Sequence, residues 1–343
     1  MTSNPTKILL LTTMVSGALV AASSNSWLSA WMGLEVNLMS FIPLMSNVKN
    51  MYNTEASLKY FIVQVLASAT LMFAVTMKST MEGLFTYAET LSTSTLICTP
   101  LLMKSGAAPL HWWFPGVMEG LSWENCTWLM TVQSAAPLML ISYSIENNLF
   151  ITTIIAMSVV IGAVGGLNQT SMRSIMTYSS INHTGWMLMA MVTSESMWVM
   201  YFLTYSLLVT TVTMTIQLSK TSFINQMMMT NKESLTMKFM MFCCLLSLGG
   251  LPPFTGFMPK WFVIQSMAAS NLAPMAVLMV TMSLITLYYY LKMCYSSFLM
   301  LNTEPKWNLQ QQKMTAKHHG LVLILSTLSL SGTLLCTLLT NVT

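Results

Sequence analysis

The stretch Leu246-Ser-Leu-Gly-Gly-Leu-Pro-Pro253-Phe-Thr-Gly-Phe-Met-Pro-Lys260-Trp261 lies inside an apolar segment that runs from about 237 to 267. Proline has no N–H, and its ring clashes with the carbonyl four residues earlier, so the Gly249–Pro253 run predicts an interrupted helix. The carbonyls of Leu248 and Gly249 should then lack helical partners. In lipid such groups need protein or water, so we expect the break to face the interior of a helix bundle.

A second apolar segment, about 94–114, is interrupted in the same way by Lys104-Ser-Gly106-Ala-Ala-Pro109. The residues that predict the two breaks are Gly106 and Pro109 in the first, and Gly249, Gly250, Pro252 and Pro253 in the second. Paired interruptions at corresponding positions are typical of transporter inverted repeats. The pattern predicts two inverted five-helix halves with broken helices 4 and 9; ordinary kinked helices are the alternative.

The composition excludes a soluble protein. Hydrophobic residues make up 54% of the 343 residues and charged residues 7%, whereas soluble domains carry about 25% charged residues. A net charge of +4 without a basic run gives no sign of a nucleic-acid partner. No run alternates apolar and polar residues as a membrane β-barrel requires. The six cysteines form no C-x-x-C motif, and we interpret them as buried apolar thiols.

A membrane helix needs about 20 mostly apolar residues, and on this basis the chain is predicted to be an all-α, polytopic bundle of about eleven transmembrane helices. No linker is long enough to separate domains, so residues 1–343 are expected to form a single transmembrane domain. The predicted helices lie near 8–22, 27–45, 56–77, 94–114, 124–143, 149–167, 173–193, 197–218, 237–267, 274–298 and 319–341.

Three ionisable residues lie inside these segments: Glu35 in the second helix, Lys104 at the first break and Lys260 after the second break. An ionisable side chain at mid-bilayer costs at least about 2.5 kcal/mol, so each is a candidate functional residue. A buried Lys with a carboxylate nearby can load and release protons as neighbouring charges change. The alternative is a neutralised pair that only fixes packing.

Two further residues have less specific signals. Glu55 and Lys59 are four residues apart at a helix start, which is a favourable spacing for an ion pair. His183, in Ser179-Ser-Ile-Asn-His183-Thr, lies mid-helix among hydroxyl groups, and a proton-relay role and a structural role both remain open. Tyr288-Tyr289-Tyr290 could be an interfacial belt or a polar lining.

Several of these segments resemble one family. They are Trp31-Met-Gly-Leu-Glu35-Val-Asn37, Thr54-Glu-Ala-Ser-Leu-Lys59-Tyr-Phe, Met103-Lys104-Ser-Gly-Ala-Ala-Pro109-Leu-His111, Gly166-Leu-Asn-Gln-Thr170, Ser179-Ser-Ile-Asn-His183-Thr-Gly-Trp186 and the stretch from Leu246 to Trp261. They are similar to the NADH–ubiquinone oxidoreductase chain 2 family, the antiporter-like membrane subunits of respiratory complex I. The resemblance covers about residues 15 to 300 in register.

The resemblance implies a proton-translocating subunit of the mitochondrial inner membrane, driven by redox chemistry in other subunits. Glu35, Lys104 and Lys260 match the family's buried Glu, central Lys and distal Lys, with Lys59 and His183 as accessory positions. It also implies partners among the complex I membrane-arm subunits, including further antiporter-like subunits, and lipids such as cardiolipin. NADH, FMN, iron–sulfur clusters and ubiquinone are expected in partner subunits, because this chain has no G-x-G-x-x-G motif and no cysteine quartet.

The sequence departs from the family at Ser134, where relatives usually carry a Lys just before Ala-Pro. A hydroxyl both donates and accepts, so Ser134 is expected to hold water in a polar cavity between Lys104 and Lys260. The alternative is that Ser134 packs against another helix as small residues do. For the whole chain, the alternatives to a pump subunit are a stand-alone cation/proton antiporter and a non-pumping helical scaffold.

Overall fold

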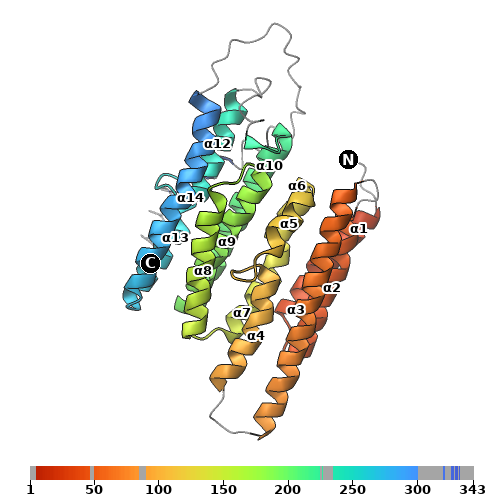
Figure 1. Cartoon of the computed structure of the whole chain (residues 1–343). Coiled ribbons are helices and arrows are strands. Elements are labelled where there is room, and N and C mark those ends of the chain that lie inside the picture. Colours follow the sequence, from red (N-terminus) through yellow and green to blue (C-terminus); the bar gives the residue numbers. More distant parts are fainter. Residues whose placement is uncertain are drawn as a thin grey trace. The chain divides into compact units, whose positions relative to one another are not determined.

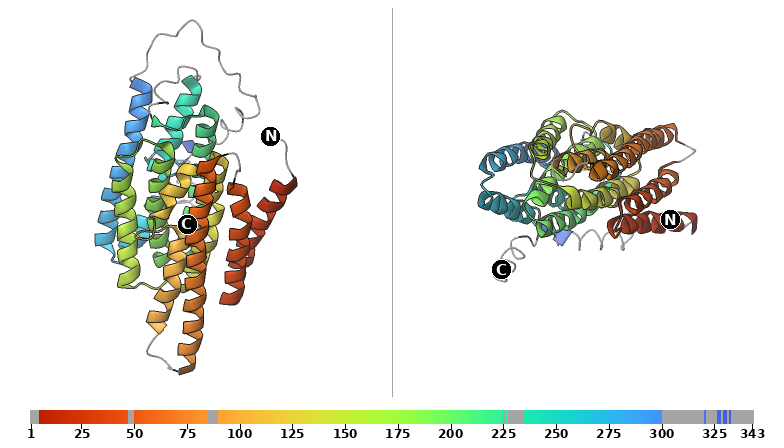
Figure 2. Two further views of the ribbon diagram at one scale, coloured as in Figure 1. Left: turned by 45° about the vertical axis from the view of Figure 1, so that its right-hand side comes forward. Right: turned by 90° about the horizontal axis from the view of Figure 1, so that it is seen from below.

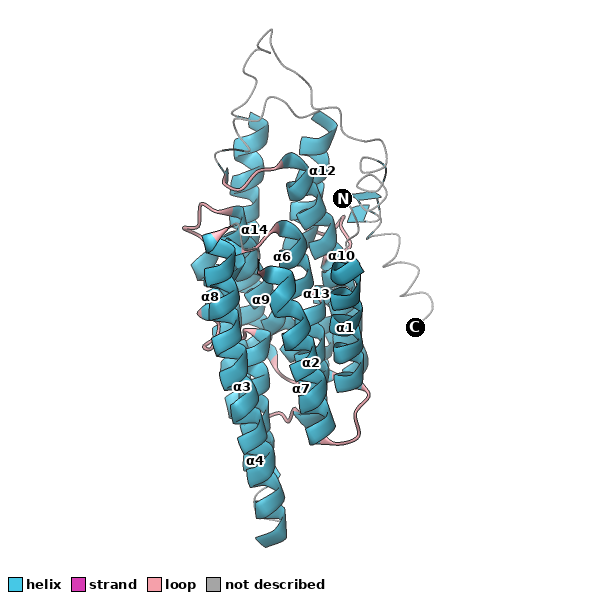
Figure 3. Ribbon diagram, turned by 90° about the vertical axis from the view of Figure 1, so that its right-hand side faces the viewer, coloured by secondary structure: helices cyan, strands magenta, loops and turns pink. Residues whose placement is uncertain are grey.

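The computed structural model describes residues 5–46, 50–84, 90–224, 226 and 235–299, together with 320, 326, 327, 329, 330 and 332. These residues are helical except for the connections between helices (Figure 3). Within the described ranges the β-structure is limited to an isolated antiparallel bridge between Ser171 and Phe223. The predicted all-α class is therefore confirmed.

The helices group into two compact units, residues 1–158 and 159–343. The first unit contains α1 (Pro5–Ala22), α2 (Trp27–Met45), α3 (Met51–Leu84), α4 (Thr90–Ser105), α5 (Trp113–Gly120), α6 (Trp123–Met130) and α7 (Val132–Ser144), and α8 (Leu149–Gly166) begins in it. In this unit α2 packs between α1 and α3, and α7 contacts α1, α2, α4 and α6 (Figure 1). The α7 helix is thus the element that most of the unit surrounds.

Helices α1 and α2 approach each other backbone to backbone. A Cβ on Gly17 would lie 2.8 Å from the backbone nitrogen of Asn37, and a Cβ on Gly33 would lie 2.6 Å from that of Ala21. Small residues permit such contacts between membrane helices, where van der Waals packing replaces the hydrophobic effect. The two glycines therefore fix how α2 lies against α1.

The second unit contains α9 (Met172–Thr193), α10 (Glu195–Ser219), α12 (Leu235–Gly249), α13 (Phe257–Ala269) and α14 (Ala273–Leu299), and the end of α8 belongs to it. The α9 helix is buried along nearly its whole length and contacts α10 and α13. The α12 helix packs on α10 and α14, and the view along the bundle shows these helices end-on (Figure 2). A helix buried on all sides is expected at the centre of a membrane bundle.

The outer faces of the long helices are apolar. Six helices of the described chain are long and apolar enough to cross a membrane: α1, α2, α3, α8, α10 and α14. Large side chains such as Leu19, Phe73, Leu149, Val277 and Leu284 are more than 60% exposed. Exposed apolar surface on this scale suits lipid, not water, and the chain is a multi-pass membrane protein.

Several predicted helices agree with the structure to within one residue, namely those at 27–45, 149–167, 173–193 and 274–298. The predicted helix at 124–143 is divided into α6 and α7 at Thr131, whose φ and ψ are −111° and −75°. The Thr131 hydroxyl donates to the Thr127 carbonyl at 2.7 Å, and such back-bonding bends helices. The predicted helix at 319–341 lies almost entirely outside the described residues.

Two helices end at a glycine with positive φ. After α4, Gly106 has φ 74°; its N–H donates to the Met103 carbonyl, and the N–H of Ala107 donates to the Leu102 carbonyl. After α12, Gly250 has φ 82°, and the equivalent bonds run to Ser247 and Leu246. This is the Schellman pattern, in which glycine adopts the left-handed conformation that ends a helix.

The next helices begin after irregular segments, α5 at Trp113 and α13 at Phe257. The helices thus end before the prolines on which the sequence interpretation relied. The glycines terminate α4 and α12, and the prolines lie in the connections that follow.

Candidate functional site

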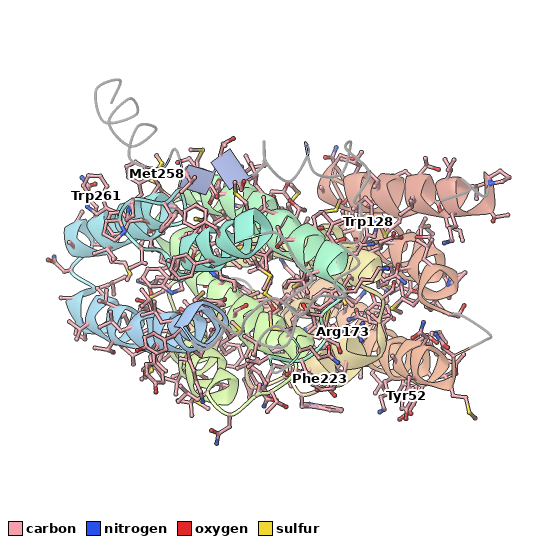
Figure 4. The ribbon with its side chains drawn as sticks, turned by 90° about the horizontal axis from the view of Figure 1, so that it is seen from above. Tyr52, Trp128, Arg173, Phe223, Met258 and Trp261 are labelled. Atoms are coloured by element: carbon pink, nitrogen blue, oxygen red, sulfur yellow. The ribbon has the colours of Figure 1, made fainter. Side chains whose placement is uncertain are left out.

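Lys260 lies in the first turn of α13 and is 5% exposed. Its ammonium Nζ donates to the Gly249 carbonyl at 2.9 Å, so the last carbonyl of α12 receives a side-chain donor in place of a helical one. The next residue, Trp261, is 39% exposed and lies at the outer edge of α13 (Figure 4). At the start of α13, Lys260 therefore points into the protein and Trp261 points outward.

The surroundings of Lys260 come from α9 and α12. The ammonium lies 5.9 Å from the centroid of the Trp186 ring, a distance at which a cation is attracted by the ring face. A Cβ on Gly250 would lie 3.0 Å from Nζ, so the glycine leaves the space that the side chain occupies. Lys260 thus fills a closely fitted position at the end of α12.

His183 joins this site from the middle of α9. It is 5% exposed, its Nδ1 lies 2.9 Å from the Tyr201 hydroxyl of α10, and it interacts with the Leu248 carbonyl and with the Lys260 charge. The Tyr205 ring lies 5.1 Å from the imidazole. The structure therefore brings His183 and Lys260 together at the end of α12, with tyrosines of α10 around the histidine.

Further polar groups line the same unit. Tyr289 and Tyr290 are 3% and 1% exposed, with ring centroids 4.7 Å apart, whereas Tyr288 is 61% exposed. The sequence left two interpretations of this triplet, an interfacial belt and a polar lining. In the structure Tyr289 and Tyr290 lie in the interior, and Tyr288 lies on the surface. The Asn182 Oδ1 and the Trp186 Nε1 are buried without a protein partner. Buried polar atoms normally have a hydrogen-bond partner, and a polar interior of this kind suits bound water.

In the first unit, Lys104 lies in the last turn of α4 and is 6% exposed. Glu35 of α2 is half-buried and acts on Lys104 electrostatically, although the two side chains form no direct ion pair. Carbonyls at the end of α4 also receive side-chain donors: Trp113 Nε1 donates to the Met103 carbonyl at 3.1 Å, and Gln64 Nε2 to the Lys104 carbonyl at 3.5 Å. Each unit thus places a buried lysine at a helix end whose carbonyls bond to side chains.

The structure places the other two predicted residues differently. Lys59 forms an ion pair with Glu55 at 2.7 Å, and both side chains are more than half exposed at the start of α3. Ser134 is half-buried, and its hydroxyl donates to the Met130 and Thr131 carbonyls of its own bend. Lys104 and Lys260 belong to different units, so a path between them through Ser134 stays a prediction.

Sequence reasoning missed a set of neutral polar residues in the first unit. Tyr60 of α3 donates to Gln133 Oε1 of α7 at 3.1 Å, and Gln133 Nε2 donates to Asn37 Oδ1 of α2 at 2.9 Å. Polar side chains buried in a membrane bundle usually have a partner on another helix. An amide in an apolar segment, which the sequence does display at Asn37 and Gln133, was the available signal.

Metal ligands do not gather in the described part of the chain, where no three His, Cys, Asp or Glu side chains lie together. The described cysteines are all buried and form no disulfide with one another: Cys98, Cys126, Cys243, Cys244 and Cys294. The site consists of buried lysines, an imidazole, hydroxyls and amides, which are groups that donate and accept hydrogen bonds.

The fold and the buried charges define a membrane protein of the antiporter-like class, and the family described as NADH:quinone oxidoreductase/Mrp antiporter, TM matches residues 24–286. NADH-ubiquinone oxidoreductase chain 2 of Anopheles gambiae is 48% identical over 93% of both chains, and that of Locusta migratoria is 41% identical over 98% of this chain and 97% of its own. The chain belongs to the NADH-ubiquinone oxidoreductase chain 2 family.

Two solved structures share the fold. A chain of respiratory complex I from Thermus thermophilus with bound aureothin superposes with a TM-score of 0.86 at 23% identity, covering 97% of this chain and 79% of that one. A chain of the Mrp complex from Dietzia sp. DQ12-45-1b gives 0.79 at 16% identity, covering 96% and 75%. The fold is thus shared by a chain of a respiratory complex and a chain of an Mrp complex.

Proposed function

We propose that this chain is a proton-translocating membrane subunit of a respiratory NADH:ubiquinone oxidoreductase. The observation that carries the proposal is the environment of Lys260: a buried ammonium on the freed Gly249 carbonyl, with His183 and its tyrosines beside it. An ammonium held by a carbonyl and not by a carboxylate is not neutralised. Its protonation therefore responds to the field that neighbouring charges set up.

In this proposal Lys104 with Glu35, and Lys260 with His183, are the two places where protons are held. Lys59 and Ser134 are accessory residues. The pairs α4–α5 and α12–α13 act as discontinuous membrane helices in two inverted halves of a single transmembrane domain. The matching ends of α4 at Gly106 and of α12 at Gly250 support this arrangement, since such paired interruptions mark the repeats of transporters.

The assembly and location follow from the family. We infer partners among the membrane-arm subunits of complex I, further antiporter-like subunits included, in the mitochondrial inner membrane with lipids such as cardiolipin. NADH, FMN, iron–sulfur clusters and ubiquinone are proposed to bind partner subunits, so the catalysed reduction takes place outside this chain. The residues here supply only proton binding and release.

Replacing Lys104 with Met tests the pump function. The change removes the charge with little change in volume, so the complex should assemble while quinone reduction coupled to proton uptake falls by about tenfold or more. The measurement is proton uptake and quinone reduction by the purified complex in liposomes. Lys292→Met, at an exposed lysine of α14, is the matched control. Undiminished pumping by Lys104→Met would point to a scaffold.

A stand-alone cation/proton antiporter is the second candidate, because the Mrp complex chain shares the fold. Purification separates the two. A subunit of the oxidoreductase leaves the membrane only with its partners, whereas an antiporter exchanges cations for protons by itself in a vesicle. Cation-dependent proton exchange by the isolated chain would replace the first proposal with the second.

A further inference from the structure

Three neutral side chains form a continuous hydrogen-bonded chain across three helices of the first unit. The Tyr60 hydroxyl of α3 donates to Gln133 Oε1, and Gln133 Nε2 of α7 donates to Asn37 Oδ1 of α2, at 3.1 and 2.9 Å. Tyr60 and Asn37 are each 2% exposed. Gln133 is the middle member, because only a group with both an acceptor and a donor can bond to both neighbours in this way.

Each end of this chain is connected to an element that carries or contacts the charged pair. Asn37 lies on α2, the helix of Glu35, two residues after it and on a different face. The Tyr60 ring lies 5.9 Å from that of Trp113, whose indole donates to the carbonyl just before Lys104. Gln133 therefore joins the helix that carries Glu35 to the helix and aromatic ring that contact the end of α4.

The neighbouring residue does not make such a connection. Both hydroxyl bonds of Ser134 run to carbonyls of its own bend, Met130 and Thr131. At this level of α7, the polar contact with other helices thus comes from Gln133.

We infer that Gln133 is a positioning residue: it fixes α2, and with it Glu35, at a set distance from Lys104. Glu35 and Lys104 interact electrostatically without a direct ion pair, so the strength of their interaction depends on where α2 lies relative to α4. Gln133 fixes α2 against α3 and α7 through Asn37 and Tyr60. This inference rests on the proposed function, since it assigns Gln133 to the same Glu35–Lys104 pair.

A positioning role and a purely structural role of Gln133 predict different results when its hydrogen bonds are removed. Hydrogen bonds between membrane helices add little to stability on average, because other partners are found when one is lost. Loss of the Gln133 bonds should therefore leave the bundle assembled. If Gln133 positions Glu35, the number of protons moved per electron falls. If Gln133 only holds helices together, assembly falls and the assembled fraction pumps normally.

The test uses the whole complex in liposomes, with Gln133→Leu, Tyr60→Phe and the double variant. We expect normal assembly and a several-fold lower ratio of protons moved to quinone reduced for each single variant. The double variant should be no worse than Gln133→Leu, because both changes break one chain. Gln265→Leu, at an exposed glutamine of α13, is the matched control and should keep the native ratio.

The outcomes are separable from those of the proposed function. If Lys104→Met lowers pumping while Gln133→Leu and Tyr60→Phe keep the native ratio, the positioning role is refuted and the pump function stands. Losses that multiply in the double variant also refute it. If Gln133→Leu does not assemble, Tyr60→Phe decides, since it removes only a hydroxyl. Normal pumping by Lys104→Met refutes the pump function itself.

Discussion

The lysine of α13 is held by fit as much as by charge. Its ammonium bonds to the Gly249 carbonyl, and the backbone of Gly250 lies so close that even a methyl group there would contact Nζ. A compact ammonium suits such a position, whereas the planar guanidinium of arginine needs more room and cannot lose its proton. A positive charge alone is therefore not enough to specify a lysine at position 260.

Lys260→Arg should consequently impair proton-coupled activity although it conserves the charge. We expect a loss comparable to that of Lys260→Met, measured as proton uptake per quinone reduced in the reconstituted complex. Lys292→Arg at the exposed site of α14 is the control. Full activity of Lys260→Arg would show that a fixed positive charge is enough at this position, and that proton exchange by Lys260 is not required.

Among the elements, the two glycine-terminated helices have the clearest consequences. A residue with a Cβ at the φ of 82° found at Gly250 has a conformational cost of about 1–2 kcal/mol. At Gly250 the new Cβ would also press on Lys260. The same helix end that terminates α12 thus sets the position of the functional lysine.

Gly250→Ala is expected to lower the thermal stability of the complex and to reduce pumping more than stability alone explains. Gly116→Ala is the matched control, because a Cβ there meets nothing within 4 Å in α5. Differential scanning fluorimetry and proton uptake are measured on both variants. Equal behaviour of the two would mean that the left-handed glycine is not needed to place Lys260.

For the molecule as a whole, burial of the thiols gives a measurable property. The five described cysteines are each at most 2% exposed. A thiol enclosed by apolar side chains is inert toward reagents that attack the thiolate. The reactivity of the native protein is therefore expected to differ sharply from that of the unfolded chain.

We expect Cys98, Cys126, Cys243, Cys244 and Cys294 to resist maleimide in the native complex and to react after denaturation, as counted by mass spectrometry of the peptides. A cysteine introduced at Ser79, on the exposed part of α3, should react at once and controls for access of the reagent. Rapid labelling of Cys126 in the native state would contradict its complete burial in α6.

The helical class, several helix bounds and the burial of Lys104 and Lys260 could be predicted from the sequence because each depends on local pattern. Apolar length predicts a membrane helix, and a charge inside it stands out. The bonds of Gln133 depend on which faces of α2, α3 and α7 meet, and no local pattern contains that information. The breaks were predicted from glycines and prolines together, with the missing proline N–H as the stated cause, whereas in the structure α4 and α12 end at the left-handed Gly106 and Gly250.

The close contact of α1 and α2 bears on how the chain enters the bilayer during synthesis. Residues 23–26 alone connect the two helices, and the glycine contacts lie on either side of Glu35 along α2. A lone helix with a carboxylate at its centre is penalised by about 2.5–3.5 kcal/mol on insertion. We expect the two helices to insert together as a hairpin, with the apolar α1 carrying the acidic α2 into the membrane.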